Sequence, residues 1–129
     1  EYVITGSKCF ITNAEYANIF TVIASTDKSK GVKGLSAFLV EADRPGITIG
    51  KEEDKMGIRT SNTCEIFFDE VRVPKNHLIG KEGDGFKIAM ITLDMARPVV
   101  GACSVGICQA CVDICTEEPS TVWKTDCGS

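Results

Sequence analysis

Three cysteines near the C-terminal end of the chain have a spacing that could serve metal chemistry. Cys108, Cys111 and Cys115 fall at i, i+3 and i+7, which places their thiols on one face of a helix. They could bind a metal ion or an iron–sulfur cluster, or pack as small apolar side chains against a neighbouring helix. A helix points its side chains outward, whereas cluster ligands usually lie in a loop that wraps the metal. The spacing therefore favours packing, and we expect no metal site.

Two further motifs lack the partners that their chemistry would need. His77 is the only histidine in the chain, which argues against a His-rich metal site and against a Ser-His-Asp triad. We expect it to be a surface-loop residue beside Pro74. The glycine-rich run at 80–85, GKEGDG, lacks the ending and the spacing of a phosphate-binding loop. We interpret it as the connection between a β-rich part of the chain and a helix.

A third stretch, at residues 8–18, has the sequence KCFITNAEYAN. A strand-like run that includes Phe10, Ile11 and Thr12 ends there abruptly in Asn13-Ala14. Aromatic and β-branched residues in such a run are typical of strands. The residues alone therefore favour a plain core strand, in which the Phe10 ring fills the interior of a β domain.

The composition is that of an ordinary soluble globular domain. The chain has 129 residues, of which 43% are hydrophobic and 25% are charged. This length is enough for one modest domain with its own core. The net charge of −4 argues against non-specific binding to nucleic acid, which needs a basic surface. We expect no apolar stretch to reach the length of a membrane span, and the longest candidate, around 99–108, is rich in glycine and alanine.

The cysteine content indicates a reducing compartment. The chain has seven cysteines, an odd number, and its N-terminal residues EYVITG carry no basic segment or cleavage signal. Free thiols are the usual state of cysteines in such a protein. The first residue is not Met, so we expect an excised or processed chain.

The elements that must position these residues fall into two halves, the first of which has a β pattern. Short runs of β-branched and aromatic residues alternate with turn-forming residues up to about residue 80. Gly6-Ser7 and Asp69-Glu70 are expected to separate neighbouring strands. The pattern predicts about seven short strands in a mainly β fold, an antiparallel barrel or sandwich. The expected strands are 2–5, 8–11, 19–25, 35–41, 47–49, 64–68 and 71–73.

The second half has a helical pattern. From Asp84, a plausible N-cap, apolar residues recur at helical spacing, beginning with Phe86 and continuing to about Thr116. Pro98 is expected to kink or restart this helix. Nothing else in the chain is large enough to bury the helix. We therefore expect that a helical domain is missing or that a partner supplies it.

With both halves in place, the sequence resembles the acyl-CoA dehydrogenase family. That family has an N-terminal helical domain, a middle β-barrel and a C-terminal four-helix domain. The resemblance implies a truncated fragment with the middle barrel at 1–82, the first helix of the C-terminal domain at 83–117 and a non-family tail at 118–129. The stretches that carry it, in order along 2–116, are YVITGSKCFITNAEYAN, FLVEADRPGITIG, KMGIRTSNTCEIFFDEVRVPKNHLIGKEGDGFKIAM and LDMARPVVGACSVGICQACVDI.

The resemblance gives the run Phe10, Ile11 and Thr12 a cofactor-binding role. In the family the matching segment lies against the flavin of FAD, and many members have Trp where this chain has Phe10. An aromatic ring can cover the isoalloxazine face, and the Thr12 hydroxyl can hydrogen-bond near its N5 edge. With the resemblance, the flavin contact is favoured over the plain core strand.

The resemblance also gives roles to residues of the helix. In the family the residues that match Asp94 and Arg97 lie near the bound acyl-CoA thioester, and an arginine offers a fixed fork of donors to such a ligand. The alternative for this pair is an ion pair on the helix face. Ala96 occupies the position where a few subfamilies carry the catalytic Glu. The resemblance therefore implies a base in the missing C-terminal domain and no catalytic residue in this chain.

The family reaction is the α,β-dehydrogenation of an acyl-CoA, here expected to be of short or medium chain length. A carboxylate removes the α-proton while a hydride leaves Cβ for flavin N5, and electron-transferring flavoprotein is the usual electron acceptor. The resemblance implies a bacterial cytoplasmic or a mitochondrial matrix protein, with the isolated chain inactive. Two alternatives stay open. One is a non-catalytic barrel remnant that forms a homo-oligomer through the exposed helix, and the other is a relative of the acyl-CoA oxidases.

The tail from about residue 118 does not resemble the family. Its codons can be chosen so that TVWKTDCGS, read one base later, gives QFGKPIAA, which is similar to the family's continuation. We predict an out-of-frame translation that ends at an early stop. The alternative is a designed tag or an independent tail. The coding DNA, read in the other frame past codon 117, tests this prediction.

Overall fold

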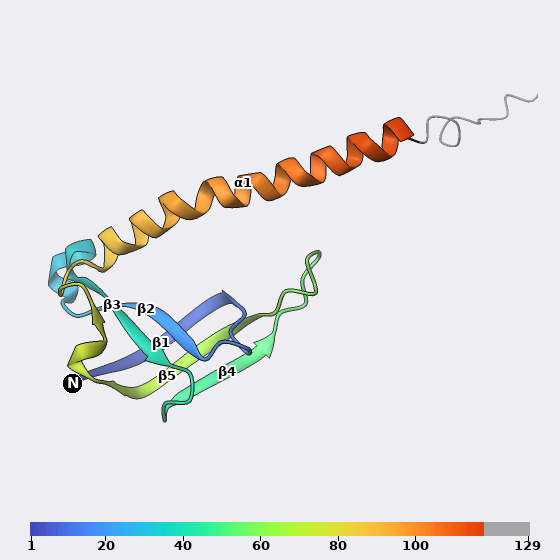
Figure 1. Ribbon diagram of the computed structural model, residues 1–129. Coiled ribbons are helices and arrows are strands. Elements are labelled where there is room, and N and C mark those ends of the chain that lie inside the picture. Colours follow the sequence, from blue (N-terminus) through green and yellow to red (C-terminus); the bar gives the residue numbers. More distant parts are fainter. Residues whose placement is uncertain (118–129) are drawn as a thin grey trace, which may run out of the picture. The chain divides into compact units, whose positions relative to one another are not determined.

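The computed structural model describes residues 1–117, which form six strands in two antiparallel sheets (Figure 1). One sheet has the order β1-β5-β4 and the other the order β2-β3-β6. Two 3-10 helices, η1 and η2, and one long helix, α1, complete the described part. The bounds are β1 Tyr2–Thr12, β2 Ile19–Ser25, η1 Lys28–Gly34, β3 Leu35–Glu41, β4 Ile47–Glu52, β5 Thr63–Val73, η2 Lys75–His77, β6 Leu78–Ile79 and α1 Gly85–Glu117.

The two sheets share one apolar core. In β2, and in β5 on either side of Asp69-Glu70, alternate side chains point inward, as the period of two along a strand requires. The rings of Tyr2 and Phe38 meet edge to face, with centroids 4.8 Å apart. This arrangement confirms the expected antiparallel β fold followed by a C-terminal helix. The buried apolar side chains are Ile4, Ala14, Phe20, Val22, Phe38, Val40, Cys64, Ile66, Phe68, Val71 and Val73.

The expected breaks within β1 and β5 are wrong. β1 continues through Gly6-Ser7, and β5 continues through Asp69-Glu70. The register shifts where Thr5 lies opposite Asp69-Glu70, and the Glu70 backbone N–H donates to the Thr5 hydroxyl at 3.2 Å. Asp69 and Glu70 therefore form a β-bulge and not a turn, because β1 and β5 remain paired on both sides of them.

The start of α1 is fixed by close packing against β3. The Ser36 hydroxyl is buried, accepts the Gly83 N–H at 3.0 Å and hydrogen-bonds the Thr26 hydroxyl at 2.9 Å. A Cβ on Gly85 would lie 2.7 Å from backbone atoms of Ser36, so only glycine fits. Asp84 occupies the N-cap position, since its carbonyl accepts the Ile88 N–H. Its carboxylate, however, accepts the Lys81 N–H instead of one from the helix.

The described chain divides into two compact units, Glu1–Ala89 and a second unit that begins at Met90. α1 runs without interruption through Pro98 and does not restart there. Within the described residues, one helical segment, Gly85–Thr116, is long and apolar enough to cross a membrane by length and composition. The expectation that no stretch reaches that length is therefore wrong. The helix joins the Gly- and Ala-rich run to flanking apolar residues.

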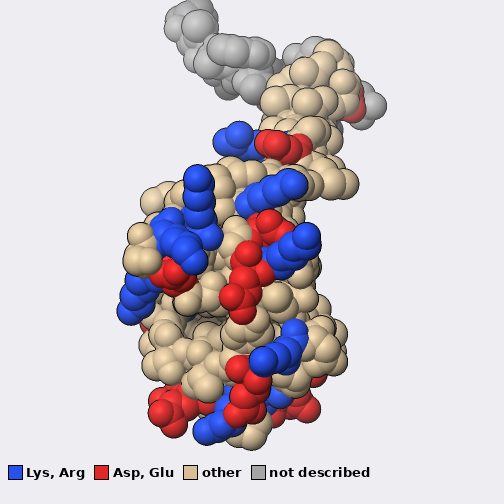
Figure 2. Space-filling view, turned by 90° about the vertical axis from the view of Figure 1, so that its left-hand side faces the viewer, with Lys and Arg blue, Asp and Glu red and all other residues tan. Residues whose placement is uncertain are grey.

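The described part of the second unit exposes most of its apolar side chains. Val105 is 69% exposed, and Val99, Ile107 and Ile114 are exposed to a similar degree. Figure 2 shows acidic and basic residues interleaved over the face of the first unit that is visible there. The six cysteines among residues 1–117 are free thiols, and no cluster of three or more His, Cys, Asp or Glu in that range could hold a metal ion. The predicted out-of-frame tail at 118–129 lies outside the described residues.

Candidate functional site

The first predicted site segment lies on a β-bulge at the end of β1. Lys8 pairs with Ile66, and the next regular pair is Ile11 with Cys64. Two residues of β1, Cys9 and Phe10, therefore lie opposite the single residue Glu65 of β5. Such a two-against-one arrangement bends the strand and changes the direction of its side chains.

The bulge turns the Phe10 ring out of the core. Phe10 has a φ of +56° and is 73% exposed. This left-handed conformation costs a non-glycine residue about 1–2 kcal/mol, so it persists only where the surroundings hold it. The alternative of a plain core strand filled by Phe10 is therefore wrong. The strand instead presents an aromatic ring to its surroundings.

A tight turn follows the bulge and explains the abrupt end of the strand. Asn13 has a φ of +60°, which asparagine tolerates better than most residues. Its carbonyl accepts the N–H groups of Tyr16 and Ala17 at 3.1 and 2.9 Å. Ala14, next in the chain, is buried. The motif Asn13-Ala14 thus reverses the chain and anchors it in the core.

Asn62, from the loop before β5, holds this turn from the other side. Its carbonyl oxygen accepts the Glu15 N–H at 3.3 Å, and its amide group donates to the Glu15 carboxylate at 3.1 Å. Its backbone carbonyl accepts the Asn13 N–H at 2.9 Å. The Asn62 side chain is almost fully buried, so these bonds satisfy groups that water does not reach freely.

Cys9 is tied to the opposite strand. Its thiol donates to the Glu65 carboxylate, with Sγ 3.2 Å from Oε1. This hydrogen bond, together with partial desolvation of the thiol and the negative charges of Glu65 and Glu53, raises the pKa of the Cys9 thiol. The protonated thiol, which is the less reactive form, is therefore favoured at this position.

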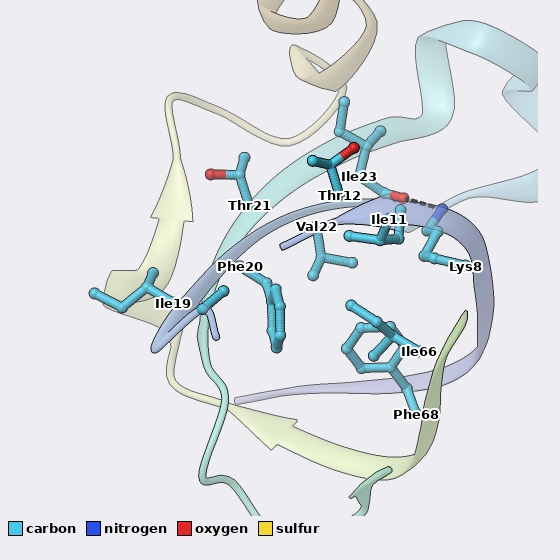
Figure 3. Close-up of a pocket in the computed structure, with 11 residues that line it drawn as sticks. Lys8, Ile11, Thr12, Ile19, Phe20, Thr21, Val22, Ile23, Ile66 and Phe68 are labelled. Atoms are coloured by element: carbon cyan, nitrogen blue, oxygen red, sulfur yellow. Dashed lines mark hydrogen bonds between the residues drawn. The ribbon is translucent and has the colours of Figure 1, made fainter. Parts of the chain in front are cut away.

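Ile11 and Thr12 line a hollow of about 350 Å³ between β1 and β2. Figure 3 shows its apolar floor, where aromatic and aliphatic side chains turn toward one another, and the Thr12 side chain on the side away from that floor. The Thr12 hydroxyl has no hydrogen-bond partner among the described residues, so it can bond to a ligand. The floor is formed by Phe20, Val22, Ile66 and Phe68.

The second predicted site segment lies on α1. Asp94 and Arg97 are exposed and one helical turn apart. Among the ion pairs of the described residues, none joins Asp94 to Arg97, which argues against the alternative of a helix-face ion pair. Ala96 lies between them. These residues belong to the second unit and Phe10–Thr12 to the first, so each segment is described by itself.

His77 has a structural environment. It lies in η2 and is half-buried, with Nδ1 3.2 Å from the Leu39 carbonyl oxygen and 3.5 Å from the Glu41 carboxylate. The Arg44 guanidinium also contacts Glu41 and holds the pKa of that carboxyl at about 2, well below its ordinary value. The expected position at the surface beside Pro74 therefore holds only in part, because His77 lies in a short 3-10 helix and is half-buried against β3.

Comparison with known proteins decides the family. Residues 1–71 match the family described as acyl-CoA dehydrogenase, middle domain. The chain belongs to the acyl-CoA dehydrogenase family. It is 54% identical over 109 residues to the short-chain specific acyl-CoA dehydrogenase of Megasphaera elsdenii, an alignment that covers 84% of this chain and 28% of that protein.

Two solved structures of the family share the fold. The butyryl-CoA dehydrogenase of Megasphaera elsdenii is 52% identical, with a TM-score of 0.87 over 90% of this chain and 30% of that one. A protein described as an FAD-dependent dehydrogenase is 34% identical, with a TM-score of 0.91 over 97% of this chain and 34% of that one. The chain thus spans about a third or less of the length of the family members it matches.

Three residues that hold the first site segment are not predicted by the sequence pattern, namely Lys8, Asn62 and Glu65. Asn62 and Glu65 are distant in sequence from the residues they contact, by 47 and 56 positions. No local pattern could have identified them. Lys8 stands directly before the segment, but its orientation follows from the bulge, which the sequence pattern did not predict.

Proposed function

We propose that this chain is the flavin-contacting part of an FAD-dependent acyl-CoA dehydrogenase that acts on short- or medium-chain acyl-CoA thioesters. The observation that carries the proposal is the bulge at the end of β1. It exposes the Phe10 ring and leaves the Thr12 hydroxyl without a partner, two positions further along the same strand. The family membership of the chain supports the same assignment.

The residues of the bulged segment fit an isoalloxazine ring. The exposed Phe10 ring would cover part of a planar aromatic face, an arrangement that offset stacking favours. The Thr12 hydroxyl would donate a hydrogen bond to the ring edge, and Ile11 would support the ring from the half-buried side of the strand. When bound, FAD supplies the acceptor for the hydride that leaves Cβ of the substrate.

The residues of α1 would act on the substrate rather than on the cofactor. Arg97 carries a permanent positive charge with several donors, suited to the oxygens of a CoA thioester. Asp94, one turn earlier, would orient it or accept a hydrogen bond from the substrate. Ala96 cannot remove a proton, and we assign no base within this chain. We therefore expect the isolated chain to show no turnover of acyl-CoA.

The proposed setting follows from the family. Electron-transferring flavoprotein is the proposed electron acceptor of the full-length protein, and the bacterial cytoplasm or the mitochondrial matrix is the proposed location. A relative of the acyl-CoA oxidases would use the same cofactor site and pass the electrons to oxygen. Measuring oxygen consumption by the full-length protein would separate these two.

A second candidate function is self-association without catalysis. The exposed apolar side chains of α1, such as Val105 and Ile107, favour it, because large apolar surfaces rarely stay bare in solution. In this alternative the β unit would hold no flavin. A dimer or larger oligomer in gel filtration, free of any visible flavin band, would support this candidate over the first.

The test is binding of FAD to the purified chain, measured by gel filtration and by the flavin absorbance that elutes with the protein. We expect the parent chain to retain FAD. Phe10→Ala and Thr12→Val should each weaken retention by about tenfold, because each removes one contact worth on the order of 1 kcal/mol or more.

Thr48→Val is the matched control for Thr12→Val. Thr48 is exposed on β4, in the same sheet but away from the bulge, so its loss should leave FAD retention unchanged. A folded parent chain that elutes without flavin would contradict the proposal. Equal retention by the parent chain, Phe10→Ala and Thr12→Val would contradict the assignment of these residues.

A further inference from the structure

Lys8 connects the two sheets directly before the bulge. β1 is an edge strand of one sheet and β2 an edge strand of the other, so no ladder joins them in the described residues. The Lys8 side chain reaches from β1 to β2, where its ammonium group donates to the Ile23 carbonyl oxygen at 2.9 Å (Figure 3). A hydrogen bond from a charged donor is stronger than one between neutral groups.

The surroundings of Lys8 leave this contact little support from packing. One hollow, of about 350 Å³, has Lys8, Ile11 and Thr12 in its wall. A second hollow, of about 230 Å³, also has Lys8 and Ile23 in its wall. It lies between β1 and β2 and extends to Ile4. The Lys8–Ile23 contact therefore lies between two hollows. It connects β1 to β2 at a place where few other side chains fill the space between the two strands.

Lys8 lies at the boundary between regular pairing and the bulge. Lys8 forms the last regular pair with β5 before the bulge, and Cys9 and Phe10 follow it without regular partners. One end of the bulge is held by Lys8 on β2, and its middle is held by the Cys9 thiol on Glu65. The left-handed Phe10 needs such restraints, because its conformation is unfavourable without them.

We infer that Lys8 is a positioning residue for the cofactor, which fixes the bulge so that Phe10 and Thr12 present their side chains together. This inference deepens the proposed function and rests on it. Lys8 itself needs no contact with FAD in this role. Its loss should loosen the segment 9–12 while the core of the β unit stays intact, because the Lys8 side chain is exposed.

The experiment compares Lys8→Met, Lys8→Arg and the parent chain. Met has a similar length but no donor, whereas Arg keeps a charged donor that can reach the Ile23 carbonyl. Lys28→Met is the matched control, since Lys28 is exposed and forms no hydrogen bond or ion pair from its side chain among the described residues. Two readouts are followed, namely retention of FAD with its absorbance spectrum, and hydrogen–deuterium exchange of the peptide that contains residues 9–13.

We expect Lys8→Met to exchange about five- to tenfold faster in this peptide and to bind FAD about fivefold more weakly, as loss of one charge-assisted hydrogen bond predicts. The spectrum of the flavin that remains bound should move toward that of free FAD. Lys8→Arg and Lys28→Met should match the parent chain in both readouts. Exchange and FAD binding unchanged in Lys8→Met would overturn the inference.

The two proposals fail in different ways. If no variant and no parent chain retains FAD, the proposed cofactor site is wrong. Exchange of residues 9–13 then still decides whether Lys8 holds the bulge. Faster exchange in Lys8→Met alone would support that part of the inference, and equal exchange in all variants would overturn it.

Discussion

The β unit and the helix that follows it differ in how they use their apolar residues. In the β unit, residues 1–89, side chains such as Phe38 and Val40 are almost completely buried. In the described part of the second unit, side chains of similar size, such as Val105 and Ile107, are about two-thirds exposed. The β unit buries its apolar side chains in its own core, whereas the described part of α1 leaves them exposed and available for contacts with other molecules or segments.

The cofactor contact and the substrate contact therefore have different support from the rest of the chain. A bulge with a left-handed Phe10 persists only on a scaffold that over-determines it, and the β unit provides that scaffold. A helix whose apolar side chains are exposed gains little stability from packing, and most helical stability in proteins comes from packing. We therefore expect the cofactor contact to survive in this chain and the substrate contact to depend on further partners of α1.

The largest expected effect comes from truncating one apolar side chain in each region. Phe38→Ala should destabilise the β unit by about 3–5 kcal/mol, because it empties a fully buried site. Val105→Ala should change the free energy of unfolding by less than about 0.5 kcal/mol, because Val105 is exposed. Denaturant unfolding followed by circular dichroism measures both. Equal losses for the two variants would mean that α1 has a packed core of its own.

Glycine substitutions sharpen the same contrast. In Gly34→Ala, the new Cβ would lie 1.9 Å from the Asp27 carbonyl oxygen, so the backbone must shift, at a cost of about 3 kcal/mol. In Gly101→Ala the Cβ meets nothing within 4 Å, and the helix should gain up to about 1 kcal/mol. Thermal unfolding should show a lower midpoint for the first variant and a higher helix content for the second. A lower helix content in Gly101→Ala would mean that the added methyl group meets a neighbour, and would contradict the absence of any atom within 4 Å of this position.

The turn after β1 tests the scaffold of the bulge. Asn62→Ala removes the hydrogen bonds to Glu15 and should destabilise the β unit by about 1–3 kcal/mol, because a buried polar network loses its centre. Asn76→Ala, at an exposed position in η2, is the control and should be neutral. Chemical denaturation reports both values. Equal stability of the two variants would show that the turn holds without Asn62.

The smallest expected effect depends on pH. The Arg44 guanidinium lowers the pKa of Glu41 from 4.5 to about 2, so the ionised carboxylate stabilises the folded state. This contribution is fully present above pH 4.5 and is lost as the pH falls toward 2. Glu41→Gln should therefore lower the thermal midpoint at pH 7, and the difference from the parent chain should shrink between pH 4.5 and 2. A difference that stays constant over this range would contradict the ion pair.

Much of the fold could be predicted from the sequence, because local patterns carry it. Runs rich in β-branched and aromatic residues predicted the strands at Ile19–Ser25 and Leu35–Glu41, whose bounds agree with the structure. Helical spacing after Asp84 predicted α1. Gly6-Ser7 and Asp69-Glu70 were interpreted as turns and are strand residues, because long-range pairing between β1 and β5 outweighs their local preference.

The candidate site could be predicted only in part. Resemblance to the family identified the segment Phe10–Thr12, but the sequence pattern alone favoured a buried Phe10. The exposure of that ring follows from a bulge set by the partner strand, and no property of residues 8–18 specifies the single residue opposite it. The contacts of Lys8 with Ile23 and of Asn62 with Glu15 likewise depend on tertiary structure.

The most direct test of the proposed cofactor contact is to locate bound FAD on the chain by following the backbone amide resonances of the protein during a titration. We expect the largest changes at Phe10, Ile11 and Thr12, with smaller changes across the adjacent hollow lined by Thr21. Resonances of the exposed part of α1 should move little. Changes confined to α1, or a folded chain whose β1 resonances do not respond to FAD, would contradict the claim that the bulge is the cofactor contact.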